Sequence, residues 1–286
     1  MLKILFPVFL LIIALLISAC SANPAPEPTA SATFTPTSTP IPEWALVWAD
    51  EFDLPDGSTP DLNTWNYSTG GNGWGNNELQ VYTDRPENAF IENGMLVIQA
   101  LEEQYMGRKY TSARINTMVR AEFTYGRFEV RARLPNTQGI WPAIWMMPTL
   151  AKYGNWPASG EIDIMEFIGS EPDRVHGTLH FGNPHEYKTA SYLIPNGETA
   201  DQDYHVFALE WEPDEIRWYV DGNLYHQVGA DEWFTSYKNA PETAPFDQPF
   251  YLIINVAVGG NWPGNPDESS LFPQRMLVDY VRVYQR

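Results

Sequence analysis

The sequence predicts an all-β fold, built as a sandwich or barrel of short antiparallel strands. From Trp44 onward no segment repeats its apolar residues at a helical spacing. Short segments with alternating apolar and polar residues are separated instead by Gly, Pro, Asn and Asp, which is typical of such folds. Asp221-Gly222 joins two of these segments in the manner of a hairpin turn. There is no internal repeat and no second linker, so we expect residues 44–286 to form one domain.

Four segments carry the clearest strand signals. In RFEVRARL, residues 127–134, apolar and charged residues alternate, so one face should be buried and the other wet. EIRWYVDGNLYHQV, residues 215–228, reads as two strands joined at the Asp-Gly turn. FYLIINVAV and MLVDYVRVYQ, residues 250–258 and 276–285, are expected to form two more strands near the C-terminus.

The N-terminal residues have the features of an export signal followed by a linker. Residues 1–19 hold one lysine and then an apolar run, which predicts a lipoprotein signal peptide. Cys20, the only cysteine, follows Ile17-Ser18-Ala19 and resembles the lipobox of bacterial lipoproteins, whose cysteine carries the lipid. An uncleaved membrane helix is the alternative. Residues 20–43 are rich in Pro, Ser and Thr, which predicts a flexible linker.

These features place the expected domain outside the cytoplasm, at a bacterial cell surface or secreted, with a lipid on Cys20 as its only membrane contact. A single cysteine excludes an internal disulfide, so the core must be stable through packing. The net charge of -19 argues against a nucleic-acid partner, whose phosphates would be repelled, and suits a neutral one. We expect a monomer.

The segment GEIDIMEFIG, residues 160–169, places three acids in an apolar strand. In a regular strand Glu161 and Asp163 share one face and Glu166 points into the core, which would be costly. A β-bulge near Met165 returns Glu166 to the face of the other two. The carboxylates of Glu161 and Glu166 would then lie roughly 5 to 6 Å apart, near the spacing of a retaining glycosidase. A solvated acidic face or a calcium site is the alternative.

The neighbouring residues favour catalysis on a carbohydrate. Trp141, Trp145 and Trp156 lie just upstream of the acids, and a flat indole face offers a platform for a sugar ring, although any one of them alone would be assigned to the core. Downstream, HGTLHFG supplies His176 and His180. On a strand these rings lie about 13 Å apart, too far to share a metal. His180 is therefore expected to contact substrate or a catalytic carboxylate, or to be structural.

Several motifs together resemble glycoside hydrolase family 16: WPASGEIDIMEFIG, NNELQVYTDRPENAFIENGMLVIQA, YTSARINT, HGTLHFG and GGNWPGNPD. The resemblance runs from about Trp48 to Tyr284. It implies a β-jelly-roll sandwich of the concanavalin A-like lectin/glucanase type, with an open cleft on its concave sheet. The Glu-x-Asp-x-x-Glu form resembles the bulged branch of the family, which holds laminarinases, agarases and carrageenases.

The resemblance also implies roles for residues. Glu161 would be the nucleophile, Glu166 the acid/base, and Asp163 would hydrogen-bond Glu161. Because close carboxylates cannot all ionise, a raised pKa is expected for the acid. The positions matched to sugar contacts are Asn77, Arg114, Trp141, Trp145, Trp156, His180 and Trp262. No cofactor is required for catalysis, but a structural calcium is implied on the convex side, through Glu51, Gly94 and Asp279.

The expected activity is that of a retaining endo-glycosidase acting on the internal β-1,3 linkages of a laminarin-like β-glucan. One alternative is another β-glycan, such as agar, carrageenan or mixed-linkage glucan. A second is a β-glucan-binding protein without activity, although such proteins typically lack the acids that this chain keeps.

Overall fold

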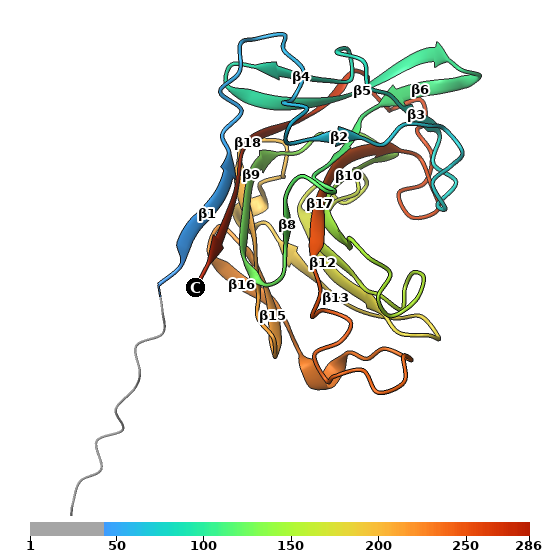
Figure 1. Cartoon of the computed structure of the whole chain (residues 1–286). Coiled ribbons are helices and arrows are strands. Elements are labelled where there is room, and N and C mark those ends of the chain that lie inside the picture. The colour runs from blue at the N-terminus through green and yellow to red at the C-terminus, as the bar shows by residue number, and fades with distance from the viewer. Residues whose placement is uncertain (1–42) are drawn as a thin grey trace, which may run out of the picture. The chain divides into compact units, whose positions relative to one another are not determined.

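The computed structural model describes residues 43–286, which form two antiparallel sheets around one apolar core (Figure 1). The predicted signal peptide, Cys20 and all but the last residue of the predicted linker lie outside the described residues. Within residues 43–286, helix is limited to two single turns of 3-10 type, Pro195–Gly197 and Ala230–Glu232. No helix in this part of the chain is long and apolar enough to cross a membrane.

The first sheet has ten strands and is antiparallel except where β3 pairs with β6. Its order along the main path is β16 (Asn223–Gly229), β15 (Glu215–Val220), β14 (His205–Trp211), β9 (Gly126–Arg133), β18 (Gln274–Gln285), β5 (Met95–Tyr105), β6 (Arg108–Ser112) and β3 (Gln80–Tyr82). Two further strands join it at the side, β1 (Ala45–Asp50) on β18 and β4 (Ala89–Glu92) on β5.

The second sheet has eight antiparallel strands and carries the candidate site. Its order is β13 (Glu186–Leu193), β12 (Arg174–Phe181), β11 (Glu161–Glu166), β10 (Ile140–Pro148), β17 (Phe250–Val258), β7 (Arg114–Asn116) and β2 (Asn66–Tyr67), with β8 (Glu122–Phe123) pairing with β17. In Figure 1, β10, β12, β13 and β17 lie in one layer, and β9, β15, β16 and β18 lie in the other.

The predicted strands are confirmed. Buried and partly exposed residues alternate along β9, as its sequence predicts. The turn between β15 and β16 places both Asp221 and Gly222 at positive φ, 49° and 78°, which is the geometry of a tight hairpin turn. β17 spans the predicted residues, and β18 begins two residues before the predicted segment.

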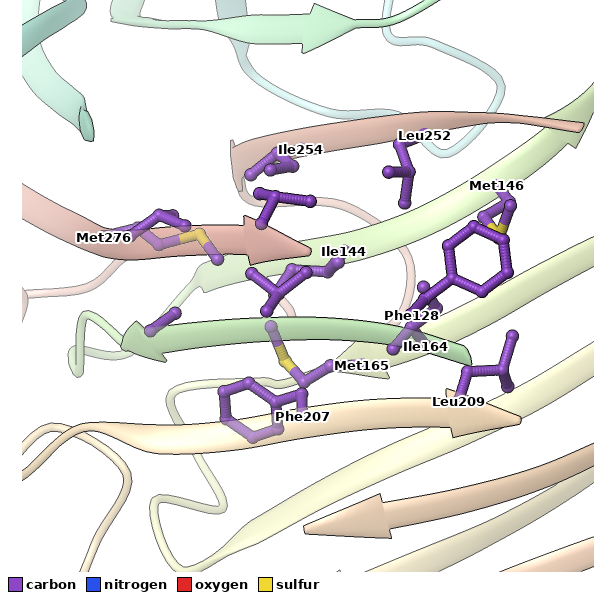
Figure 2. Packing of buried hydrophobic residues seen from close by; sticks show 14 of the residues in the cluster. Phe128, Ile144, Met146, Ile164, Met165, Phe207, Leu209, Leu252, Ile254 and Met276 are labelled. Carbon is purple, nitrogen blue, oxygen red and sulfur yellow. The ribbon is translucent and has the colours of Figure 1, made fainter. Parts of the chain in front are cut away.

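The core lies between the two sheets. Figure 2 shows Phe128 of β9, Leu209 of β14, Ile144 of β10 and Ile254 of β17 in one cluster of buried side chains. These side chains are fully buried, so the apolar faces of both sheets are removed from water together. The opposite face of the eight-stranded sheet is thereby left to carry polar and aromatic groups.

Strand β11 contains the predicted bulge. Against β10, Asp163 pairs with Trp145, but Met165 pairs with the very next residue, Ile144, so Ile164 is the extra residue. Ile164 and Met165 are both buried in the core, as Figure 2 shows, although they are adjacent in sequence. The bulge therefore turns two consecutive side chains inward and leaves the acids on the other face.

The opposite sheet supports this bulge from beneath. The fully buried Trp218 of β15 donates its Nε1–H to the backbone carbonyl of Asp163 at 2.8 Å. Gly177 of β12 makes room for it, because a Cβ there would lie 2.5 Å from Trp218 Cδ1. A tryptophan in one sheet thus satisfies the backbone of the acidic strand in the other.

We predict that Trp218→Phe destabilises the protein by about 2–4 kcal/mol, because it leaves a buried carbonyl unpaired and opens a cavity. The melting temperature should fall by roughly 5–12 °C. Thermal unfolding followed by circular dichroism measures this. Trp44→Phe, at a half-buried tryptophan near the start of the domain, serves as the matched control. Equal melting temperatures for the two variants would contradict the prediction.

Candidate active site

A cleft of about 850 Å³ lies over the face of the eight-stranded sheet that points away from the core. Alternate residues of its strands line this cleft. On β10, Trp141 and Trp145 face the cleft, whereas Ile144 and Met146 belong to the core. The same alternation governs β12 and β17, so the strand period of two decides which side chains meet in the cleft.

All three predicted acids line the cleft. Glu161 and Glu166 are half-buried, and Asp163 is 2% exposed. His180 of β12 lies opposite Glu161, and its Nε2 lies 3.3 Å from Asp163 Oδ2. His176 lies opposite Glu166. The bulge thus brings Glu166 onto the wall that holds the other two acids.

Each glutamate accepts a hydrogen bond from an indole. Trp156 Nε1 donates to Glu161 Oε2 at 2.5 Å, and Trp141 Nε1 donates to Glu166 Oε1 at 3.3 Å. An indole N–H can only donate, so each tryptophan orients one carboxylate oxygen and leaves the other directed elsewhere. The two tryptophans that the sequence placed beside the acids therefore contact them directly.

Burial raises the pKa of all three acids. It raises the pKa of Glu161 to about 8, with the charge of Asp163 adding to the effect and His180 and Trp156 opposing it. Burial also raises the pKa of Asp163, and it raises the pKa of Glu166 well above its usual range, helped by the charges of Asp163 and Glu161. For Glu166 this is the direction expected of a group that acts as an acid. At neutral pH the cluster keeps protons that separate carboxylates would lose.

The contacts of this cluster suit acid/base chemistry better than the alternative calcium site. One atom each from Glu161, Asp163 and His180 lie within 4.8 Å of one another, a spacing that can also hold a cation. Calcium takes oxygen ligands, however, and one of these three groups is an imidazole. Indole N–H groups also point at both glutamates, where a cation would repel them.

Arg114 and Trp145 form a second part of the cleft. The Arg114 guanidinium lies 4.5 Å from the Trp145 ring centre and 4.8 Å from that of Trp74, so it is held between two indoles. Trp145 Nε1 donates to Asn255 Oδ1 at 2.8 Å, and Asn255 Nδ2 donates to the Tyr82 hydroxyl at 3.1 Å. This chain of bonds fixes the orientation of the Trp145 ring.

Of the two remaining predicted sugar contacts, Trp262 lines the cleft and Asn77 does not. Trp262 lines the cleft and packs edge-on against Trp141, with ring centres 5.5 Å apart. Asn77 is not among the cleft-lining residues, and its Nδ2 donates to Asn261 Oδ1 at 2.8 Å. Its neighbour Asn76 lines the cleft instead. The predicted segment is therefore correctly placed, but the structure assigns the adjacent asparagine to the cleft.

Sequence reasoning missed several residues of the cleft wall: Trp74, Glu78, Tyr82, His185, Tyr187 and Asn255. Trp74 and Glu78 belong to WGNNELQ, residues 74–80, where a Trp between two glycines was an available signal. Glu78 is 5% exposed and accepts a bond from Gln80 Nε2 at 2.6 Å, and burial raises its pKa. His185 and Asn255 carry no local signal, because a turn after β12 brings His185 to the cleft and strand pairing brings Asn255 there.

The positions predicted for calcium lie near one another on the ten-stranded sheet. Val278 of β18 pairs with Leu96 of β5, which places Asp279 close to the Gly94 turn, and β1 leads Glu51 to the same region. Arg282 holds both carboxylate oxygens of Glu51, at 2.8 and 2.9 Å. Arg131 bonds Asp279 Oδ2 at 2.7 Å. A cation here would have to use backbone carbonyls and Asp279 Oδ1, so calcium stays a prediction.

Comparison with known proteins places this geometry in a family. Residues 72–282 match the model of "Glycosyl hydrolases family 16". A "Beta-glucanase" of Rhodothermus marinus is 50% identical over 252 residues, which cover 85% of this chain and 86% of that protein. "Glucan endo-1,3-beta-glucosidase A1" of Niallia circulans is 44% identical over 271 residues, 88% of this chain and 39% of that protein.

A solved structure agrees. The laminarinase catalytic domain of Thermotoga maritima superposes with a TM-score of 0.78 at 44% identity, over 86% of this chain and 99% of that one. The expected jelly-roll sandwich is confirmed by this likeness. The chain described here belongs to glycosyl hydrolases family 16.

Proposed function

We propose that this protein is a retaining endo-glucanase that hydrolyses internal β-1,3 linkages of a laminarin-like polysaccharide. The observation that carries the proposal is the bulge in β11, which sets Glu161, Asp163 and Glu166 on one wall of the cleft. The names of the relatives, a beta-glucanase and a glucan endo-1,3-beta-glucosidase, support the substrate class.

In the first step Glu161 attacks the anomeric carbon while Glu166 protonates the glycosidic oxygen. The bond between that carbon and oxygen breaks, the reducing-end fragment leaves as an alcohol, and the sugar becomes esterified to Glu161. Trp156 bonds Glu161 through Oε2, which leaves Oε1 to attack. Trp141 bonds Glu166 through Oε1, which leaves Oε2 to carry the proton.

In the second step Glu166, now a carboxylate, takes a proton from a water molecule. The water oxygen bonds to the anomeric carbon, the ester to Glu161 breaks, and the β configuration is restored. Both glutamates return to their starting protonation states, so no other reactant is needed.

The ionisation pattern suits these roles. Burial and two neighbouring carboxylates raise the pKa of Glu166 well above its usual range, which favours the protonated form that an acid needs. Glu161 must be ionised to attack, and the Trp156 bond and the nearby His180 both favour its ionised form. Asp163 also has a raised pKa, so the two neighbouring acids titrate together as a pair.

The charge of the cleft favours a neutral glycan. Among the cleft-lining residues Arg114 is the only Lys or Arg, and it is already held between two indoles. The whole chain carries a net charge of -19, which would repel a sulfated polymer such as carrageenan. Several aromatic faces line the same cleft, as stacking on sugar rings requires.

A β-glucan-binding protein without activity is the rival from another class. The retained acids speak against it, since three buried carboxylates destabilise the fold and serve no purpose in simple binding. Laminarin that is bound without release of reducing ends would favour the binding protein.

For its location, we propose an extracytoplasmic monomer held to the membrane by a lipid on Cys20. The lipobox-like residues before Cys20 and the Pro/Ser/Thr-rich residues 20–43 support this arrangement, since a long tether would let the cleft reach insoluble polymer.

We predict that Glu161→Gln and Glu166→Gln each lower kcat on laminarin by at least about 10³-fold, because each removes a group that acts at the reacting atoms. The activities of the two variants should differ on an aryl β-laminaribioside, a substrate whose phenol leaves without protonation. On that substrate Glu166→Gln should recover its first step, while Glu161→Gln should remain inactive. Laminarin hydrolysis by Glu161→Gln at the wild-type rate would refute the mechanism.

We also predict that Glu161→Gln stabilises the protein at alkaline pH. An acid whose pKa rises to about 8 on folding holds its proton in the folded state and loses it when unfolded, so stability falls as pH rises from about 4.5 to 8. Glutamine escapes this loss. Its advantage should be near zero at pH 4 and about 4–5 kcal/mol at pH 8.5, or roughly 9–18 °C in melting temperature.

Thermal melts of Glu161→Gln across this pH range test the stability claim, with the exposed Glu102→Gln as control. A constant difference in melting temperature at every pH would show that the carboxylate charge is not its cause.

For the anchor, Cys20→Ser should release the protein from the membrane fraction while activity on laminarin persists in the soluble fraction. Metabolic labelling with a fatty acid provides the readout. If the serine variant still incorporates lipid, the anchor lies elsewhere.

A further inference from the structure

His185 lies outside the set of family positions discussed above, yet it touches that set directly. It stands in the turn between β12 and β13, immediately before β13 begins. This turn starts at Gly182, whose φ of 78° suits a glycine, and it brings His185 back over the end of β12. His185 Nε2 lies 2.9 Å from His180 Nδ1, and its ring centre lies 4.9 Å from that of Trp156.

The second ring nitrogen of His180 faces the acids. His180 Nε2 lies 3.3 Å from Asp163 Oδ2. That oxygen is buried and, among the described residues, accepts no hydrogen bond, so the approach of His180 Nε2 is a close polar contact. His180 therefore stands between two polar partners, His185 at one nitrogen and Asp163 at the other.

When Asp163 is ionised, only one of the two neutral tautomers of His180 suits both of its neighbours. A carboxylate only accepts, so His180 Nε2 must carry the proton that faces it. His180 Nδ1 is then a lone pair and needs a donor, which the Nε2–H of His185 can supply. With the opposite tautomer, a lone pair of His180 would face the Asp163 oxygen, and the ionised acid would lose its partner.

We propose that His185 is a positioning residue, which donates to His180 Nδ1 and so holds His180 in the tautomer whose Nε2–H faces the ionised Glu161–Asp163 pair. The consequence for catalysis rests on the proposed glucanase function, whereas the tautomer itself does not.

The surroundings of His185 leave it neutral and able to donate. Burial and the neighbouring His180 lower the pKa of His185, and Glu186 opposes them. The other titratable groups near His180 are Glu161 and Asp163 on β11 and Tyr187 on β13, whose ring centre lies 6.0 Å from that of His180. At neutral pH His185 therefore contributes one donor and one acceptor and no charge.

The direction of the effect follows from which state is stabilised. An N–H of His180 that faces the acid pair favours the ionised form of that pair, so loss of this N–H raises the apparent pKa of the pair. The enzyme needs this ionised form to attack the substrate. Loss of the His185 donor should thus move the acid limb of the pH profile of kcat/KM to higher pH.

Two substitutions at this position separate the donor from the ring. His185→Phe keeps an aromatic ring beside Trp156 but removes the N–H, while His185→Gln removes the ring but keeps an N–H near the position of Nε2. For His185→Phe we expect the acid limb to rise by about 0.5–1 pH unit, so that kcat/KM on that limb falls about 3- to 10-fold. For His185→Gln we expect the acid limb to stay within about 0.2 unit of the wild type.

The tautomer can also be observed without substrate. The chain has five histidines, few enough for ¹⁵N-histidine NMR to resolve their ring nitrogens. We expect protonated Nε2 on His180 in the wild type and in His185→Gln, and a larger fraction of protonated Nδ1 in His185→Phe, where Nδ1 has lost its donor. An unchanged His180 tautomer in His185→Phe would overturn the proposal, as would a pH profile that shifts in His185→Gln but not in His185→Phe. A wild type that is inactive on laminarin would count against the proposed function alone, because the NMR comparison would still decide the role of His185.

Discussion

The bulge at Ile164 in strand β11 is the constraint on which the rest of the site depends. A strand that belongs to a buried sheet must send alternate side chains into the core, and three acids cannot be divided that way without burying one among apolar groups. The extra residue solves the conflict locally, because Ile164 and Met165 both turn inward and Glu166 returns to the cleft. The carbonyl of Asp163, at the edge of this irregularity, finds its partner in Trp218 of the other sheet. The same bulge therefore determines both how the two sheets pack and where the acids lie.

The burial that forms the site also makes ionisation of its three carboxylates unfavourable. Burial raises the pKa of all three carboxylates, and the charge of Asp163 adds to this effect at Glu161 and Glu166. The groups that face these acids are neutral donors rather than cations. Indole N–H groups face Glu161 and Glu166, and an imidazole faces Asp163. Neutral donors stabilise the ionised form of an acid but still let it gain a proton. An arginine beside the acid would hold it in the ionised form. An acid that must gain and lose a proton in each cycle is suited to the first kind of neighbour.

Much of this arrangement could be predicted from the sequence, since it depends on local rules. The phase of Glu166 against Glu161 implied a bulge, and alternation along residues 127–134 implied a half-buried strand, and the structure contains both. Contacts that depend on pairing between distant strands could not be predicted. His185 meets His180 only because a turn folds back onto β12, and Asn255 reaches Trp145 only through the register of β17 with β10. For the same reason the asparagine that lines the cleft is Asn76 and its neighbour Asn77 bonds Asn261, because a loop gives no period from which to choose between them.

The central claim is that the bulged strand presents Glu161 as a nucleophile. Its most direct test is to trap the covalent intermediate with a 2-fluoro β-laminaribioside, which forms the sugar ester quickly and loses it slowly, and to locate the label by peptide mass spectrometry. The account predicts one equivalent of sugar on Glu161, with the same treatment leaving Glu161→Gln unlabelled. A label on Asp163 or Glu166, or hydrolysis that proceeds with inversion and no trapped ester, would contradict it.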